Sequence, residues 1–66
     1  MTAADEAYEA MFDEGMSLSG NLGIWQGYVE SLGADHAYAR TAWSAFEAVR
    51  IRFIEAAERS RAASGA

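Results

Sequence analysis

The 66 residues contain no cysteine and no proline, and ten acidic side chains against five arginines give a net charge of −5. Fifteen of the 34 apolar residues are alanine, which leaves 19 larger apolar side chains for a core. A chain of this length forms one domain that removes only about 60% of its surface from water. The lack of cysteine excludes disulfides and thiolate metal sites, so we expect stability to depend on self-association or on a partner.

The charge is divided unevenly along the chain. Residues 1–33 carry six acids and no base, whereas residues 34–66 carry four acids and five arginines. A secretory signal or transit peptide needs basic residues near its start, so neither is expected. The longest uncharged stretch is 15 residues, 15–29, and a membrane-spanning helix needs about 20 mostly apolar residues. We therefore expect a cytoplasmic protein with no membrane partner.

The absence of proline and the three-and-four spacing of apolar residues predict an all-α protein. Thr2 is a candidate cap for a first helix, with Asp5 as its capping-box partner, and this helix is expected to end near Gly15. Residues 17–23 concentrate Ser, Gly and Asn, which predicts a turn. Apolar side chains at helical spacing are expected on one face of the first helix: Ala4, Tyr8, Met11, Phe12 and Met16.

A second helix is predicted over residues 21–32, with Gly33 just past its end. Its apolar residues step by four and three along one seam, namely Leu18, Leu22, Trp25, Val29 and Leu32. Gly23 and Gly27 each cost about 1 kcal/mol against alanine inside a helix. Because of that cost, residues 23–29 are also compatible with a short strand.

The strongest periodic pattern predicts a third helix over residues 36–62, with Asp35 as its cap. Its apolar face comprises Tyr38, Ala42, Ala45, Phe46, Val49, Phe53 and Ala56, with Trp43 and Ile54 at the edge. Three pairs support it by about 0.2–0.5 kcal/mol each: Glu47 with Arg50, Glu55 with Arg59 and Glu58 with Arg61. This helix is as long as the first two together. The expected fold is therefore a small three-helix unit, with two short helices packed along one long C-terminal helix. Residues 1–62 would form a single helical domain and residues 63–66 a frayed tail.

The residue types in the sequence give little support for a catalytic function. His36 is the only histidine, so a nucleophile–base pair or a histidine-rich metal site cannot be assembled from one chain. The carboxylates lack the Glu-x-x-His spacing of dimetal helical bundles. We expect His36 to be a structural or surface residue at a helix start, and we expect no catalytic residue, no metal site and no cofactor.

The glycines invite two sharper interpretations. The spacing of Gly20, Gly23 and Gly27 matches neither phosphate-binding pattern, and it favours close helix packing or a break in the helix. Trp25-Gln26-Gly27 is similar to the turn signature of the small secreted helical-hairpin proteins named for their Trp-X-Gly motif. In that family the motif lies between two long helices of similar length. Here only 24 residues precede it, and they contain the predicted break.

The first helix also carries an acidic cluster, Asp5, Glu6, Glu9 and Asp13, that is expected to lie opposite Tyr8 and Met11. Like charges one turn apart destabilise a helix by about 0.2–0.5 kcal/mol per pair. The cluster is either a solvated face or a docking face for a basic partner. In composition the chain is like inhibitors that imitate DNA, among them phage-encoded inhibitors of CRISPR complexes, which are often small and acidic.

Direct nucleic-acid binding is not expected, because the five arginines are scattered along a net-acidic chain. Eight aromatic residues exceed what a unit of this size can bury, and aromatic side chains are favoured anchors at interfaces. The partner-binding candidates are therefore the acids and the apolar side chains at the seam edges and outer face: Asp5, Glu6, Glu9, Asp13, Glu14, Tyr28, Trp43, Ile51 and Ile54.

The sequence thus predicts a non-catalytic protein–protein interaction protein of phage or bacterial type, acting as an inhibitor, regulator or adaptor. Its partner would be a protein with a basic surface, and the chain itself would be a homo-oligomer or a bound subunit. Two alternatives stay open at this point. One is a DNA-mimicking inhibitor of a nucleic-acid-binding complex, and the other is a structural homodimer or assembly subunit.

Overall fold

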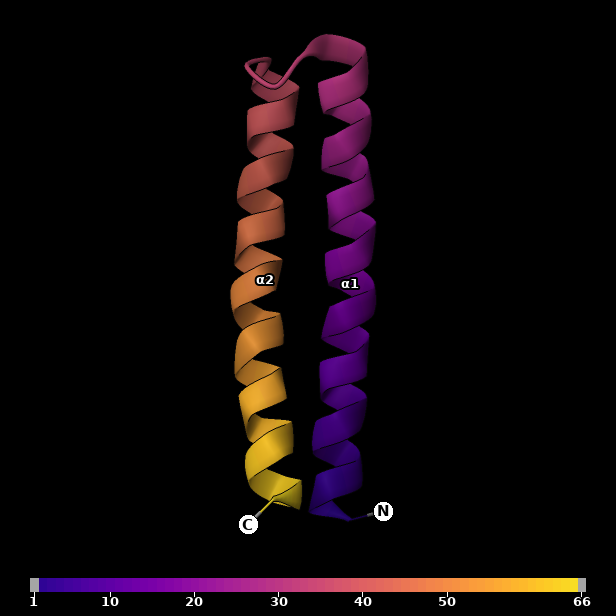
Figure 1. The fold of residues 1–66 in the computed structure, drawn as a ribbon, viewed down its shortest axis with the longest axis vertical. Coiled ribbons are helices and arrows are strands. Elements are labelled where there is room, and N and C mark those ends of the chain that lie inside the picture. Colours follow the sequence, from indigo (N-terminus) through magenta and orange to yellow (C-terminus); the bar gives the residue numbers. More distant parts are fainter. Residues whose placement is uncertain (1, 66) are drawn as a thin grey trace.

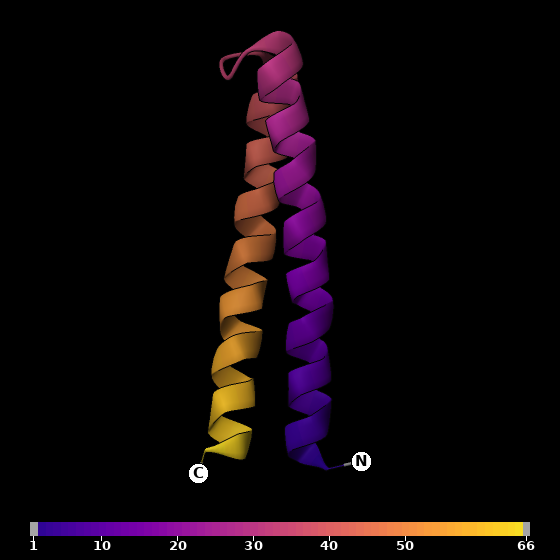
Figure 2. The ribbon, with the colours of Figure 1, turned by 45° about the vertical axis from the view of Figure 1, so that its right-hand side comes forward.

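The computed structural model describes residues 2–65, which form two antiparallel helices joined by a short turn (Figure 1). Helix α1 spans Ala3–Leu32 and helix α2 spans Ala37–Ser64. The hairpin measures 45 × 15 × 12 Å. Both views place the two ends of the described chain side by side, opposite the turn (Figures 1 and 2). The all-α class is confirmed, but the expected three-helix architecture is wrong.

The predicted break between the first two helices does not exist. Helix α1 continues through Gly15 and through residues 17–23, which were expected to form a turn, and residues 23–29 are helix rather than strand. The side-chain amide of Asn21 donates a hydrogen bond of 2.8 Å to the carbonyl oxygen of Ser17 one turn earlier. A glycine costs only about 1 kcal/mol inside a helix, and continuous packing against α2 outweighs that local preference.

The two ends of α1 are determined by hydrogen bonds and backbone conformation of the residues at those ends. The Asp5 amide donates to Thr2 Oγ1 at 3.1 Å and the Thr2 amide donates to Asp5 Oδ2 at 3.3 Å, so the predicted capping box is confirmed. Gly33 ends α1 with a φ of 94°, a conformation that favours glycine.

The expected cap of the C-terminal helix is wrong by one residue. His36, not Asp35, caps α2, because its Nδ1 accepts a hydrogen bond of 3.1 Å from the Tyr38 amide. Helix α2 continues past the predicted end, so residues 63 and 64 of the expected tail lie in its last turn. Residue 66 of that tail lies outside the described residues.

One seam holds the two helices together. Along α2 all the buried side chains and two half-buried phenylalanines alternate in steps of three and four: Ala39, Ala42, Phe46, Val49, Phe53, Ala56 and Ser60. Along α1 the same steps connect the half-buried residues that form the seam: Ala4, Ala7, Met11, Glu14, Leu18, Asn21 and Trp25. Further half-buried residues flank them at Gly15, Ser17, Leu22 and Val29. This is the heptad pattern of an antiparallel coiled coil. The predicted α2 face is confirmed for five of its seven members, while Tyr38 and Ala45 are exposed.

The seam is narrow and made largely of small side chains. The buried apolar residues of the described chain are Ala39, Ala42, Val49 and Ala56, and α1 contributes no residue that is fully buried. Two helices share a single interface, so most of the large apolar side chains outside the seam are exposed, while Leu22 and Val29 beside it are half-buried. The hairpin therefore exposes most of its aromatic and aliphatic side chains.

Candidate interaction surfaces

Pairs of side chains across the hairpin fix its register. The ring centroids of Trp25 and Trp43 are 4.9 Å apart. Arg52 Nε lies 3.2 Å from an oxygen of Glu14. In each such pair the two residue numbers add to between 66 and 68, so a residue of α1 can be matched with the residue of α2 at the same level along the hairpin.

We define the aromatic face as Tyr8, Phe12, Trp43 and Ile54, four exposed side chains from both helices. Trp43 packs on Trp25 and meets Phe46 edge to face at 5.1 Å. Each of the four directly follows a seam residue in the chain, and the positions after the two seam positions of a heptad lie on one side of the helix. The face therefore runs along one side of the seam.

Two carboxylates border this face at its open end. A shallow depression is lined by Asp5, Tyr8, Glu9 and Phe12, all of them exposed. The acids were expected on the side opposite Tyr8, but Asp5 and Glu9 line the same depression as the two rings. Negative charge and aromatic surface are thus adjacent on α1.

Glu14 has a different environment from the other acids of α1. It is half-buried at the seam, and Arg52 Nε donates to its carboxylate oxygen at 3.2 Å. Glu14 is expected among the docking acids, whereas in the structure it forms an ion pair between the helices. The exposed acids of this region are Asp5, Glu6, Glu9 and Asp13, and α1 contains no basic residue.

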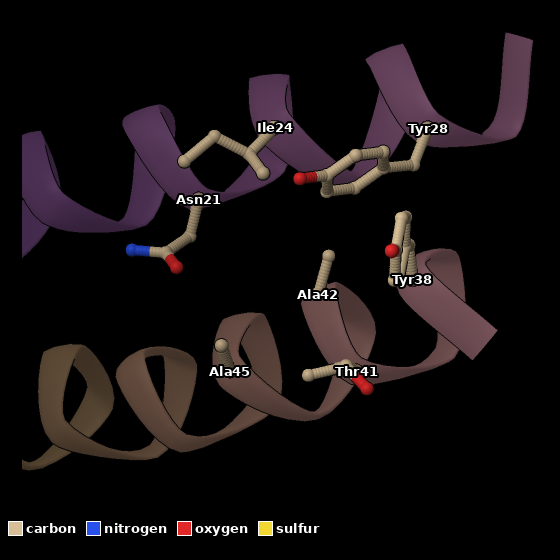
Figure 3. Close-up of a pocket in the computed structure, with 7 residues that line it drawn as sticks. All are labelled: Asn21, Ile24, Tyr28, Tyr38, Thr41, Ala42 and Ala45. Atoms are coloured by element: carbon tan, nitrogen blue, oxygen red, sulfur yellow. The ribbon is translucent and has the colours of Figure 1, made fainter. Parts of the chain in front are cut away.

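We define the tyrosine groove as the depression on the other side of the seam, at the turn end (Figure 3). It is lined by Asn21, Ile24, Tyr28, Tyr38, Thr41, Ala42 and Ala45. The rings of Tyr28 and Tyr38 lie 5.8 Å apart across it, tilted by 55°. The His36 ring packs edge-on against Tyr38 at 4.9 Å. This histidine therefore caps a helix and supports a wall of the groove.

The predicted apolar contact residues are divided among three surfaces. Trp43 and Ile54 belong to the aromatic face, and Tyr28 belongs to the tyrosine groove. Ile51 is exposed on α2 between the seam positions Val49 and Phe53, away from α1. Tyr8 and Phe12 are expected on the apolar face of the first helix and Ile24 is not among the predicted contact residues, but all three side chains are exposed. The heptad spacing of the seam was the signal that could have shown these three side chains to be exposed.

A further ion pair lies on the surface of α2. Glu47 holds Arg50 through two hydrogen bonds, and these bonds together with its charge raise the pKa of Arg50 above its ordinary value. Residues 2–65 bring no three histidine or acidic side chains together in a way that could hold a metal ion. In the same part of the chain, neither helix combines the length and apolar character needed to cross a membrane.

Comparison with known proteins adds no relationship: no protein family matches this chain, and neither a curated protein nor a solved structure is similar to it. The hairpin does have two long helices of similar length, as the resemblance to the Trp-X-Gly proteins implies. Trp25-Gln26-Gly27, however, lies inside α1, and residues 33–36 form the turn. The motif therefore does not have the position that it has in that family.

Proposed function

We propose that this protein acts without catalysis by binding a partner protein through the aromatic face. The observation that supports this most directly is that small side chains are buried while large aromatic side chains are exposed. The largest buried apolar side chain of the described hairpin is that of Val49, which is itself 5% exposed, while the rings of Tyr8, Phe12 and Trp43 are exposed. Tyrosine and tryptophan are enriched among the residues that contribute most to protein–protein binding.

The acidic residues beside this face imply that the proposed partner has a positively charged surface. Asp5 and Glu9 border Tyr8 and Phe12, and no base on α1 offsets them. Complementary charge at the rim of an interface speeds association and adds salt dependence. The partner surface would therefore combine an apolar pocket with surrounding lysine or arginine. An inhibitor, regulator or adaptor would each use such a contact.

A DNA-mimicking inhibitor is the second candidate. Its support is the exposed carboxylate cluster, Asp5, Glu6, Glu9 and Asp13, on a helix with no base. Carboxylates along a helix can enter a cationic groove that otherwise binds phosphates, and the partner would then be a nucleic-acid-binding protein. Under this proposal duplex DNA and this protein compete for one site.

Affinity capture with matched variants tests the proposal. Ile54→Arg alters the aromatic face, and Ile51→Arg places the same change on the outer side of α2, where the exposure is similar at 53% against 41%. We expect Ile54→Arg and Trp43→Ala to lose a partner that the unchanged chain and Ile51→Arg retain. Retention by all variants, with folding verified by circular dichroism, contradicts the proposal.

The charge reversal Glu9→Lys tests the contribution of the acids beside the aromatic face. We expect weaker binding to the captured partner and a smaller dependence on salt. If excess duplex DNA displaces the protein from that partner, the second candidate is favoured over the first. Unchanged affinity and unchanged salt dependence would remove the acids from the proposed contact.

A further inference from the structure

We propose that the side of the hairpin carrying the tyrosine groove is the interface between two copies of this chain, which form an antiparallel four-helix bundle. In this dimer Ile24 of each copy inserts into the groove of the other. The inference goes beyond the proposed function, because it uses the opposite side of the seam and leaves the aromatic face free.

The wall of the groove on α2 has the form of a coiled-coil socket. Tyr38, Thr41, Ala42 and Ala45 follow the spacing i, i+3, i+4, i+7, which is the set of four residues that receives one side chain from a facing helix. Tyr38, Thr41 and Ala45 are exposed, so the hairpin itself does not fill this socket. An apolar side chain at the same level of a second chain would fill it.

Ile24 has the position that such a side chain needs. It is 56% exposed on the edge of the groove, and the register of the hairpin places it level with residues 42–44 of α2. A second hairpin laid on this side in the same direction brings its own Ile24 to the level of the socket. Burying an isoleucine side chain stabilises an assembly by about 1.5–3 kcal/mol.

Glycines on either side of Ile24 permit a close approach. Gly20 and Gly27 are at i−4 and i+3 from it, so they are its neighbours on the helix surface. A Cβ added at either glycine meets no atom within 4 Å in the hairpin, so packing within the chain does not require glycine there. Another helix can therefore come close to α1 beside Ile24.

Charge selects the orientation of the second copy. Helix α1 carries six acids and no base, whereas α2 carries five arginines and three glutamates. Packing α1 on α2 of the other copy sets opposite net charges together, while packing α1 on α1 sets six acids against six. The favoured dimer has both turns at the same end and every neighbouring helix antiparallel, as in many four-helix bundles.

Two pairs of opposite charges on this side agree with that orientation, while Glu55, at the heptad position of Thr41, is an acid on the α2 side. Glu6 and Asp13 share the heptad position of Gly20 and Gly27, and Arg52 and Arg59 share that of Tyr38 and Ala45. In the proposed dimer the register places Asp13 near Arg52 of the second copy and Glu6 near Arg59.

The available area suits a dimer. The broad side of the hairpin measures 45 by 15 Å, which is roughly 675 Å² on each copy. Stable protein–protein interfaces bury about 800 Å² per partner, and side chains add to the outline of the backbone. A dimer that used the whole of this side would therefore approach the size of an ordinary interface.

The mass in solution and three variants test the inference. Sedimentation equilibrium of the unchanged chain should give twice its 7.1 kDa, and a folded monomer overturns the proposal. We expect Ile24→Arg to weaken dimerisation at least 100-fold, while Ile51→Arg on the outer side of α2 leaves it within about threefold. Gly20→Leu should also dissociate the dimer, and it should keep the hairpin helical because leucine has a higher helix propensity than glycine and a Cβ at this position meets no atom within 4 Å. A dimer that survives both Ile24→Arg and Gly20→Leu overturns the proposal.

A distance measurement tests the orientation. The chain has no cysteine, so Asp35→Cys allows one spin label in each turn. Turns at the same end give a label separation below roughly 25 Å, since helix axes in a bundle lie about 10 Å apart. A separation near the 45 Å length of the hairpin overturns the proposed arrangement. None of these variants alters the aromatic face, so a negative result leaves the proposed function to be judged by Trp43 and Ile54.

Discussion

The ring of Phe53 on α2 lies against Gly15 of α1, so closely that a Cβ added at this glycine would be 3.1 Å from Cε1 of the ring. The ring occupies the space beside the seam that a side chain at position 15 would take. Phe53 is consequently half-buried although it belongs to a hairpin with a shallow core.

This contact predicts that alanine substitution at two glycines of α1, Gly15 and Gly23, will change the stability of the protein by different amounts. Gly23→Ala should stabilise the protein by about 0.5–1 kcal/mol, because it raises helix propensity and the added methyl group meets no atom. Gly15→Ala should be close to neutral, since the same gain is offset by crowding of the Phe53 ring, and Gly15→Val should cost about 1–3 kcal/mol. Urea unfolding at a fixed protein concentration measures all three. Equal stabilisation by both alanine variants contradicts the contact.

The turn depends on the backbone of Gly33. Its φ of 94° is strained for any residue with a side chain, so Gly33→Ala should lower the free energy of unfolding by about 1–3 kcal/mol. The open space around this residue excludes a steric clash as the cause. Thermal unfolding checks the value, with Gly23→Ala as the matched control inside a helix. A stabilising Gly33→Ala would show that the turn has another conformation.

The tryptophan pair should contribute more through Trp25 than through Trp43. Trp25 is half-buried in the seam, so Trp25→Ala should cost about 2–3 kcal/mol, below the ~3–5 kcal/mol of a fully buried aromatic. Trp43 is 42% exposed, and its removal should cost less. Chemical denaturation followed by circular dichroism compares the two variants. A larger loss at Trp43 would mean that another chain buries it under the conditions of the measurement.

The ion pair between Glu14 and Arg52 should add little stability. Its Nε to oxygen distance is 3.2 Å, but the Arg52 side chain is 53% exposed and screened by solvent. Arg52→Ala should therefore cost less than about 1 kcal/mol, and the difference should shrink in 1 M salt because the Debye length falls to about 3 Å. Unfolding at low and high salt tests both statements. A larger loss that salt does not change would point to packing of the arginine stem.

Local chemistry in the sequence determined the helical class, the Thr2 capping box, the end of α1 at Gly33 and most of the buried side of α2. Each of these depends on residues within a few positions of one another: a cap and its partner three residues on, a glycine in an unusual conformation, and alanines, a valine and two phenylalanines at heptad spacing.

Only the tertiary structure decided whether α1 is one helix or two. The cost of Gly15, Gly20 and Gly23 is local and visible in the sequence, whereas the packing that offsets it comes from α2, more than 20 residues away. Because the two helices predicted in this region are one continuous helix, the fold has no third element that could bury Tyr8 and Phe12. A hairpin has one seam, and this is the physical reason why these aromatic side chains form an exposed face instead of a core.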